Sequence, residues 1–160
     1  MRHTITILVE NEFGVLMRIA GLFSARGYNI ETLNVAPTLD ETVSRLTLVT
    51  IGDDRTIEQI KKQLNKLIPV IKTEDISHMV HLERGLLMLK VIDANDLRKN
   101  AEAAGAKIID HEAGSYFIAE LTGSPEEVDA FLASIDAEYI IEASRTGPVG
   151  MRRGSKGFVV

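Results

Sequence analysis

The 160-residue chain contains no cysteine and no tryptophan, and only 5% of its residues are aromatic. Without cysteine it cannot form a disulfide, a thiolate nucleophile or a cysteine-ligated metal site, which is compatible with a reducing compartment. No apolar run approaches the ~20 residues that a membrane-spanning helix needs. The core must therefore be aliphatic, and we expect a cytoplasmic protein with no membrane partner and no targeting segment ahead of its first strand.

Basic charge and catalytic motifs are also scarce. The formal net charge is −5, which argues against a nucleic-acid partner. No HExxH, GxSxG, P-loop or GxGxxG pattern occurs. His78 and His81, with Glu83 nearby, have a loosely ligand-like spacing, but such residues on a strand or linker are more often exposed to solvent. The sequence therefore predicts no catalytic residue, no metal site and no bound cofactor.

Residues 11–30 form the stretch around which the chain is organised. They follow a short alternating strand at 4–9, and Asn11 stands where a helix N-cap is expected. Gly27 is typical of the left-handed residue that ends a helix. Between them, apolar residues at i, i+4, i+7 and i+8 predict one buried helical stripe, formed by Val15, Ile19, Leu22 and Phe23.

The start of this helix can bind an anion. Its first amides have no partner inside the helix and carry about half a positive charge. A carboxylate against Gly14, Val15 and Leu16 would satisfy them without a lysine or arginine. Asn29, at the start of the next strand, can both donate to and accept from a ligand. Taken singly, the two asparagines are as well explained by capping and turning; together around one glycine they indicate a site.

The second half of the chain repeats the first. Gly27 aligns with Gly105 and Gly52 with Gly123, and an apolar triplet recurs at one offset: Ile57, Ile60 and Leu64 against Val128, Phe131 and Ile135. The first half is predicted to contain strand 4–9, helix 14–26, strands 28–36 and 44–51, helix 56–67 and strand 70–76. The second is predicted to contain strand 86–92, helix 95–104, strands 106–111 and 115–122, helix 125–134 and strand 138–145.

The order of elements predicts a βαββαβ unit in each half. The predicted fold is therefore α+β, with two tandem ferredoxin-like domains, 1–78 and 79–160. Ser124, Pro125 and Glu127 predict a capping box at the last helix. The basic tail after residue 148 is typical of a loose end, or of a segment that becomes ordered against a partner.

Other proteins of this topology fit the residues less well. RNA-recognition modules stack bases on aromatic side chains of the middle strands, which are nearly absent here. Metallochaperones of this topology need paired cysteines. Acylphosphatase-type enzymes need an arginine in the first loop, where this chain has Asn11 and Glu12. A small-molecule sensor and a purely structural oligomerisation module remain.

The motif Asn-x-x-Gly-Val-Leu-x-Arg-Ile-x-Gly-Leu-Phe-x-x-Arg-Gly-Tyr-Asn-Ile at 11–30, followed by Val-Ala-Pro-Thr at 35–38, closely resembles the ACT domain of the small, regulatory subunit of acetolactate synthase (acetohydroxyacid synthase). The resemblance is dense over residues 3–76. It is thinner afterwards, although Arg-Thr-Gly at 145–147 and Arg-Gly at 153–154 match that family's C-terminal signature.

The resemblance implies a homodimer with a branched-chain amino acid, commonly valine, bound at the joint between two N-terminal sheets. Asn11, Gly14, Val15 and Leu16 of one subunit would face Asn29 and Ile30 of the other. A small apolar effector side chain would suit the lining offered by Val15, Leu16, Ile30 and Ala36.

The resemblance also implies a partner. The chain would mediate feedback inhibition and activation of a catalytic large subunit in valine, isoleucine and leucine biosynthesis. Thiamine diphosphate, magnesium and FAD would belong to that subunit, and this chain would carry no catalytic residue. The alternative is an ACT-type oligomerisation module that does not respond to an effector.

Overall fold

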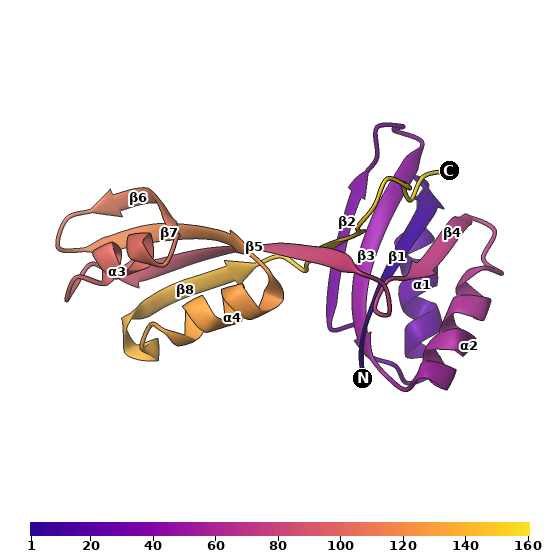
Figure 1. The fold of residues 1–160 in the computed structure, drawn as a ribbon, viewed down its shortest axis with the longest axis horizontal. Coiled ribbons are helices and arrows are strands. Elements are labelled where there is room, and N and C mark those ends of the chain that lie inside the picture. The colour runs from indigo at the N-terminus through magenta and orange to yellow at the C-terminus, as the bar shows by residue number, and fades with distance from the viewer. The chain divides into compact units, whose positions relative to one another are not determined.

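A computed structural model describes every residue from Met1 to Val160 and divides the chain into two compact units (Figure 1). Unit 1 consists of Met1–Leu82 together with Val149–Val160, and unit 2 consists of Glu83–Pro148. The C-terminal segment therefore departs from the expected division into 1–78 and 79–160, because it returns to the first unit. None of the helices is both long enough and apolar enough to cross a membrane.

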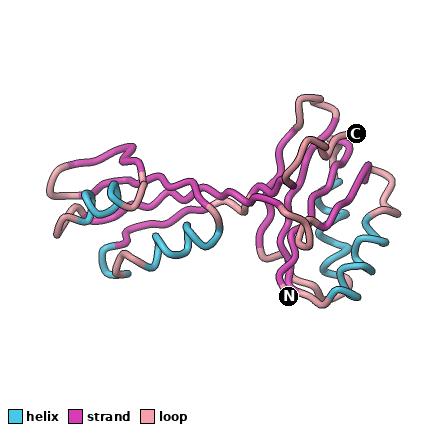
Figure 2. Tube along the Cα trace, in the orientation of Figure 1, coloured by secondary structure: helices cyan, strands magenta, loops and turns pink.

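Unit 1 is a four-stranded antiparallel sheet with two helices on one face (Figures 1 and 2). The strands lie in the order β2-β3-β1-β4, which makes β2 and β4 the edges. In chain order the elements are β1 (Arg2–Glu10), α1 (Val15–Ser24), β2 (Thr32–Pro37), β3 (Val43–Ile51), α2 (Asp54–Leu64) and β4 (Val70–Asp75).

Alternation along the strands decides which side chains form the core of unit 1. Because successive residues of a strand point to opposite faces, every second residue of β1 meets the helices. These residues and the apolar stripes of α1 and α2 are fully buried together. The main contributors are Ile5, Ile7, Val9, Ile19, Phe23, Leu46, Leu48, Ile57, Ile60 and Leu64.

Unit 2 has the same order of elements. Its strands lie in the order β6-β7-β5-β8, again antiparallel. The elements are β5 (His81–Ile92), α3 (Leu97–Ala103), β6 (Lys107–Glu112), β7 (Tyr116–Gly123), α4 (Pro125–Ala133), the 3-10 turn η1 (Ala137–Tyr139) and β8 (Ile140–Arg145). The predicted capping box is confirmed, because Ser124 accepts from the Glu127 amide and Glu127 accepts from the Ser124 amide.

The internal repeat holds in backbone detail. Gly27 and Gly105 follow the first helix of each unit with φ of 71° and 90°. The next residue in each case donates its amide to an equivalent helix carbonyl: Tyr28 to Phe23, and Ala106 to Ala101, at 3.1 and 3.0 Å. The α+β class and the two ferredoxin-like halves are therefore as predicted.

The C-terminal segment 149–160, which contains β9 (Val149–Arg152), packs on the sheet of unit 1 opposite the helices. Arg45 donates to the carbonyl of Gly150 at 2.7 Å, from the face of β3 that points away from α1 and α2. Phe158 is 7% exposed and forms a small apolar cluster with Leu8 and Val43. The segment is not a loose end.

Polar contacts hold the same segment. Arg152 forms an ion pair with Glu74 at 3.1 Å, and Lys72 donates to the carbonyl of Val159 at 3.1 Å. A Cβ at Gly150 would lie 2.7 Å from Cδ1 of Ile76, so the segment approaches the sheet as closely as a residue without a side chain allows. The basic residues of this segment are thus partly used within the chain.

Candidate functional site: a bare helix start at the end of β1

Gly14 opens α1 in the left-handed conformation, with φ of 81° and ψ of −4°. It occupies the N-cap position, and no side chain accepts from the first amides of the helix. No acidic residue stands in the first turn either. The amides of Val15, Leu16 and Met17 therefore have no capping side chain and no acid in their own helical turn to offset their partial positive charge.

The predicted N-cap at Asn11 is wrong. Its backbone amide donates to Thr42 at 2.7 Å, and its Nδ2 donates to the carbonyl of Glu41 at 2.9 Å. The side chain thus fastens the loop after β1 to the loop between β2 and β3. Because the side-chain amide of Asn11 makes this tertiary hydrogen bond, it does not cap α1.

The neighbouring loop is itself ordered. Asp40 accepts from both the hydroxyl and the amide of Thr42, at 2.6 and 2.9 Å. These hydrogen bonds hold the pKa of the Asp40 carboxyl below its usual 3.8. The loop between β2 and β3, which Asn11 contacts, is therefore held by hydrogen bonds within the chain itself.

Space is available above the helix start. A Cβ added at Gly14 would meet nothing within 4 Å. A hollow of about 80 Å³ lies beside the loop, lined by Val9, Glu10, Asn11, Glu12, Val15, Leu16, Val35, Ser44 and Leu46. This is well below the roughly 300–1,000 Å³ of sites that enclose a small molecule. The hollow alone is therefore too small to enclose a small molecule.

The other predicted residues on the β2 side divide into two groups. Ala36 lies near the end of β2, where it pairs with Arg45 of β3, and it is exposed on the same end of the sheet as Asn11. Asn29 and Ile30 precede β2 at the opposite end. There the Asn29 carbonyl accepts from the Thr50 hydroxyl at 2.7 Å.

Strand register measures how far apart the two groups lie. Thr32 pairs with Val49 of β3, whereas Glu10 pairs with Val43. Val49 and Val43 are six residues apart on one strand, which is roughly 20 Å at about 3.4 Å per residue. Within one chain, Asn29 and Ile30 are therefore not brought together with Asn11, Gly14, Val15 and Leu16.

Sequence reasoning missed several residues around the hollow. Glu10 and Glu12 place exposed carboxylates beside the helix start, and Val35 and Ser44 complete its lining from β2 and β3. Val35 and Ser44 are brought close by the register of β1, β2 and β3, which local sequence spacing does not reveal. The acidic pair adds a chemical feature, an attraction for a cationic group next to amides that attract an anion.

Two family models match the chain. The model described as the AHAS small subunit-like ACT domain matches residues 5–72, and the one described as the small subunit of acetolactate synthase matches residues 84–154. The bare helix start and its hollow lie within the first of these segments.

Similar proteins match along the full length. The chain is 44% identical over 161 residues to the acetolactate synthase isozyme 3 small subunit of Escherichia coli (strain K12), with 98% of both chains covered. It is 44% identical over 160 residues to the probable acetolactate synthase small subunit of Archaeoglobus fulgidus, covering 98% of this chain and 99% of that one. The crystal structure of the acetolactate synthase small subunit from Thermotoga maritima matches with a TM-score of 0.90 at 35% identity, over 98% and 99% of the two chains.

Proposed function

This chain belongs to the family of acetolactate synthase small subunits, and from that premise we propose that it is a non-catalytic regulatory subunit. It binds a branched-chain amino acid, with valine as the preferred effector, at the joint between two copies of unit 1. Through that binding it adjusts the activity of a catalytic acetolactate synthase subunit, with which it assembles. Thiamine diphosphate, magnesium and FAD are assigned to the catalytic subunit.

The observation that carries this proposal is the uncapped start of α1. Gly14 places no side chain at the helix start, a Cβ there would meet nothing within 4 Å, and no side chain caps the first amides of α1. A ligand carboxylate placed there gains hydrogen bonds and the helix dipole. An α-amino acid supplies such a carboxylate without requiring a basic side chain from the protein.

An amino acid carries an ammonium group as well as a carboxylate. Glu10 and Glu12, both exposed beside the hollow, would attract that group at short range. Leu16 and Val35 line the hollow and are partly exposed, so they offer apolar surface to a short branched side chain. Together these groups favour an aliphatic amino acid over a simple organic acid.

A second copy of the chain supplies what one copy lacks. Asn29 and Ile30 lie at the far end of the sheet from Gly14, so they can reach a shared ligand only from another subunit. β2 is an unpaired edge of the sheet, the kind of strand that pairs with a second chain. Apolar side chains near the start of α1 and in the adjoining β2–β3 region are fully or partly exposed and would be covered by such pairing: Phe13, Met17, Val35 and Leu39.

The test is a titration of valine, leucine and isoleucine against the activity of a reconstituted complex of this chain with its catalytic subunit. Calorimetry on the small subunit alone measures binding directly. Threonine, which has the shape of valine but carries a hydroxyl, and the 2-oxo acid that corresponds to valine serve as controls. We expect valine to bind and inhibit, and both controls to bind at least tenfold more weakly. An assembled complex whose activity ignores all amino acids would instead support a structural module.

A further inference from the structure

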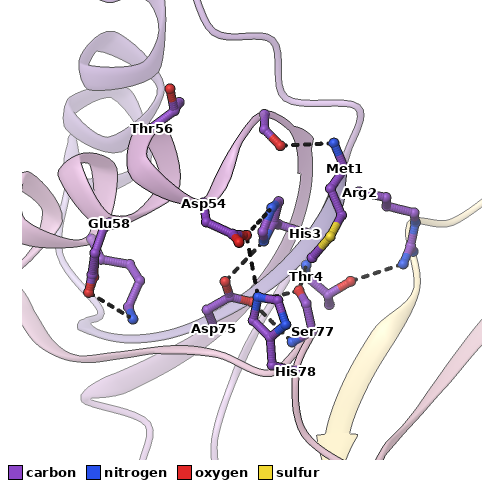
Figure 3. Close-up of polar contacts among 12 residues, drawn as sticks. Met1, Arg2, His3, Thr4, Asp54, Thr56, Glu58, Asp75, Ser77 and His78 are labelled. Atoms are coloured by element: carbon purple, nitrogen blue, oxygen red, sulfur yellow. Dashed lines mark hydrogen bonds and ion pairs between the residues drawn. The ribbon is translucent and has the colours of Figure 1, made fainter.

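Three polar side chains from distant parts of unit 1 point at one position beside the start of α2 (Figure 3). His3 lies on β1, Asp54 is the first residue of α2, and His78 lies in the turn after β4. Their ligand atoms all lie within 4.8 Å of one another. None of these residues belongs to the proposed effector site.

The two distances from the histidine nitrogens to the Asp54 oxygen fit a shared metal ion better than they fit hydrogen bonds. Nε2 of His3 lies 3.6 Å from Oδ1 of Asp54, and Nε2 of His78 lies 3.5 Å from the same oxygen. Both are too long for good hydrogen bonds. Ligands about 2.0–2.1 Å from a tetrahedral zinc ion are roughly 3.3–3.4 Å apart, close to the spacing seen here.

His3 provides a second and independent observation. Its side chain is completely buried, yet its Nε2 has no hydrogen-bond partner. A buried nitrogen of this kind is costly unless something binds it. That nitrogen faces Asp54 and His78, so the cluster contains a buried, unsatisfied nitrogen that points at its centre and could bind a metal ion.

Asp75 fixes the orientation of the buried ring. Its Oδ2 lies 3.1 Å from Nδ1 of His3, while its Oδ1 accepts from both the amide and the hydroxyl of Ser77, at 3.0 and 2.6 Å. In the tautomer with the proton on Nδ1, the ring donates to Asp75 and leaves the lone pair on Nε2. This is the carboxylate–histidine arrangement that supports metal-binding histidines.

We propose that His3, Asp54 and His78 bind one divalent transition-metal ion, zinc above all, with Asp75 as the positioning carboxylate behind His3. Two imidazole nitrogens and one carboxylate oxygen form a ligand set that suits zinc better than calcium or magnesium, which prefer oxygen ligands. Asp54 and His78 are well exposed, at 72% and 59%, so water can complete a fourth position. The ion ties together β1, α2 and the turn after β4.

The net charge of the cluster supports this assignment. With neutral imidazoles, Asp54 and Asp75 give two negative charges against one dication. The competing arrangement is a metal-free ion-pair cluster, in which protonated histidines occupy the same place. The metal site and the metal-free ion-pair cluster differ in how many metal ions bind per chain. They also differ in whether substitution of Asp54 or His78 abolishes metal binding.

The experiment uses the full chain without an affinity tag, because His3 is near the N-terminus and a histidine tag would bind zinc itself. Calorimetry measures zinc binding, and cobalt serves as a visible probe, since tetrahedral cobalt with nitrogen and oxygen ligands absorbs strongly. Thermal unfolding is followed with and without zinc. The chain has no cysteine and four histidines, so its unfolded state competes weakly for the ion.

Exposed members are the best sites for substitution, because the buried His3 also packs against the core. His78→Ala and Asp54→Asn are matched by His111→Ala, an exposed histidine of β6, and Glu58→Gln, an exposed acid of α2. Asp75→Asn tests positioning, with an expected loss of roughly 10–100-fold in zinc affinity. Substitution of a direct ligand, Asp54 or His78, should reduce zinc affinity more than Asp75→Asn does.

We expect one zinc ion per chain, a tetrahedral cobalt spectrum, and a rise in Tm of about 5 °C or more. His78→Ala and Asp54→Asn should abolish all three, while the two matched controls retain them. Zinc binding that survives both substitutions, binding that is lost equally in His111→Ala, or no binding by the folded wild-type chain would each overturn the proposal.

Discussion

Gly14 and Asp96 take the same left-handed backbone conformation at the same position of the two units. Each is the N-cap of its unit's first helix, with φ of 81° and 58°, and neither caps the helix through its side chain. Asp96, however, places a carboxylate at the helix start and pairs it with Lys99 at 2.8 Å. That hydrogen bond and charge hold the pKa of Asp96 below its usual 3.8. Unit 2 thus carries its own anion where unit 1 leaves the position open.

The repeat therefore predicts the effect of Gly14→Asp. Because aspartate is already accommodated at this backbone conformation in unit 2, the variant should fold and assemble. Its carboxylate would compete with a ligand carboxylate for the amides of α1 and repel it. We expect the half-inhibitory valine concentration to rise by at least tenfold, within the roughly 5–150-fold range of allosteric couplings.

Gly14→Asn is the matched control for charge. Asparagine has the same size and also tolerates positive φ, but it adds no negative charge. It should impair valine binding less than aspartate does. Equal valine affinity in Gly14→Asp and the wild type would show that the helix start is not the carboxylate site.

A second prediction concerns the C-terminal segment. Phe158 packs with Leu8 and Val43, and the cationic groups of Arg45 and Lys72 lie 5.4 and 5.2 Å from its ring centre. Phe158→Ala should lower the free energy of unfolding of unit 1 by about 3–5 kcal/mol, as in other cavity-forming substitutions.

Val160→Ala in the same segment should change stability by less than about 0.5 kcal/mol, because Val160 is largely exposed. Chemical denaturation of both variants measures the difference. A Phe158→Ala protein as stable as the wild type would mean that the segment does not pack on the sheet in solution.

A third prediction concerns alkaline pH. The Tyr116 hydroxyl donates to Asp110 at 2.8 Å, and this hydrogen bond raises the pKa of Tyr116 above its usual 10.0. The neutral phenol is thus favoured in the folded state. The resulting stabilisation is present below the unfolded pKa and is lost as the pH rises through the folded pKa.

Asp110→Asn should lower the pKa of Tyr116 toward 10.0. An ultraviolet titration of phenolate formation measures it, and Tyr116→Phe identifies which of the three tyrosines gives the signal. If Asp110→Asn leaves the titration curve unchanged, the hydrogen bond is not maintained in solution.

A fourth prediction concerns catalysis. The purified chain, supplied with pyruvate, thiamine diphosphate and magnesium, should form no acetolactate. When added to its catalytic subunit, the chain should change that subunit's activity. The measurement is a colorimetric acetoin assay on the small subunit, the catalytic subunit and their mixture. Turnover by the small subunit alone would contradict the non-catalytic assignment.

The periodicity of apolar residues predicts the helices and strands well. In the helices the apolar residues form regular stripes, and along the strands they differ between the two faces of each sheet. The sequence predicts that β2 starts at residue 28, but the strand begins at Thr32. Tyr28 and Ile30 pack against the core without pairing in the sheet, so their hydrophobicity is that of a buried loop. Likewise β5 begins at His81 and not at 86, because five mostly polar residues extend it ahead of its apolar part.

The candidate sites were less predictable from sequence. Asn11 has the residue type of an N-cap, but its side chain bonds to Glu41, thirty residues away, and only the fold reveals this. The same limit applies to His3, Asp54 and His78, whose spacing along the chain matches no metal motif. Strand register and the position of α2 bring them together.

The central claim, that one effector contacts two copies of the chain, is most directly tested by mixing two defective variants. Gly14→Asp and Asn29→His homodimers should both fail to respond to valine, because every site contains one altered side. A mixed dimer has one site with both sides altered and one with both intact. Co-refolding or co-expressing the two variants should therefore restore valine binding in calorimetry and inhibition in the complex. If the mixture remains as unresponsive as either variant alone, Gly14 and Asn29 do not form one site across a dimer.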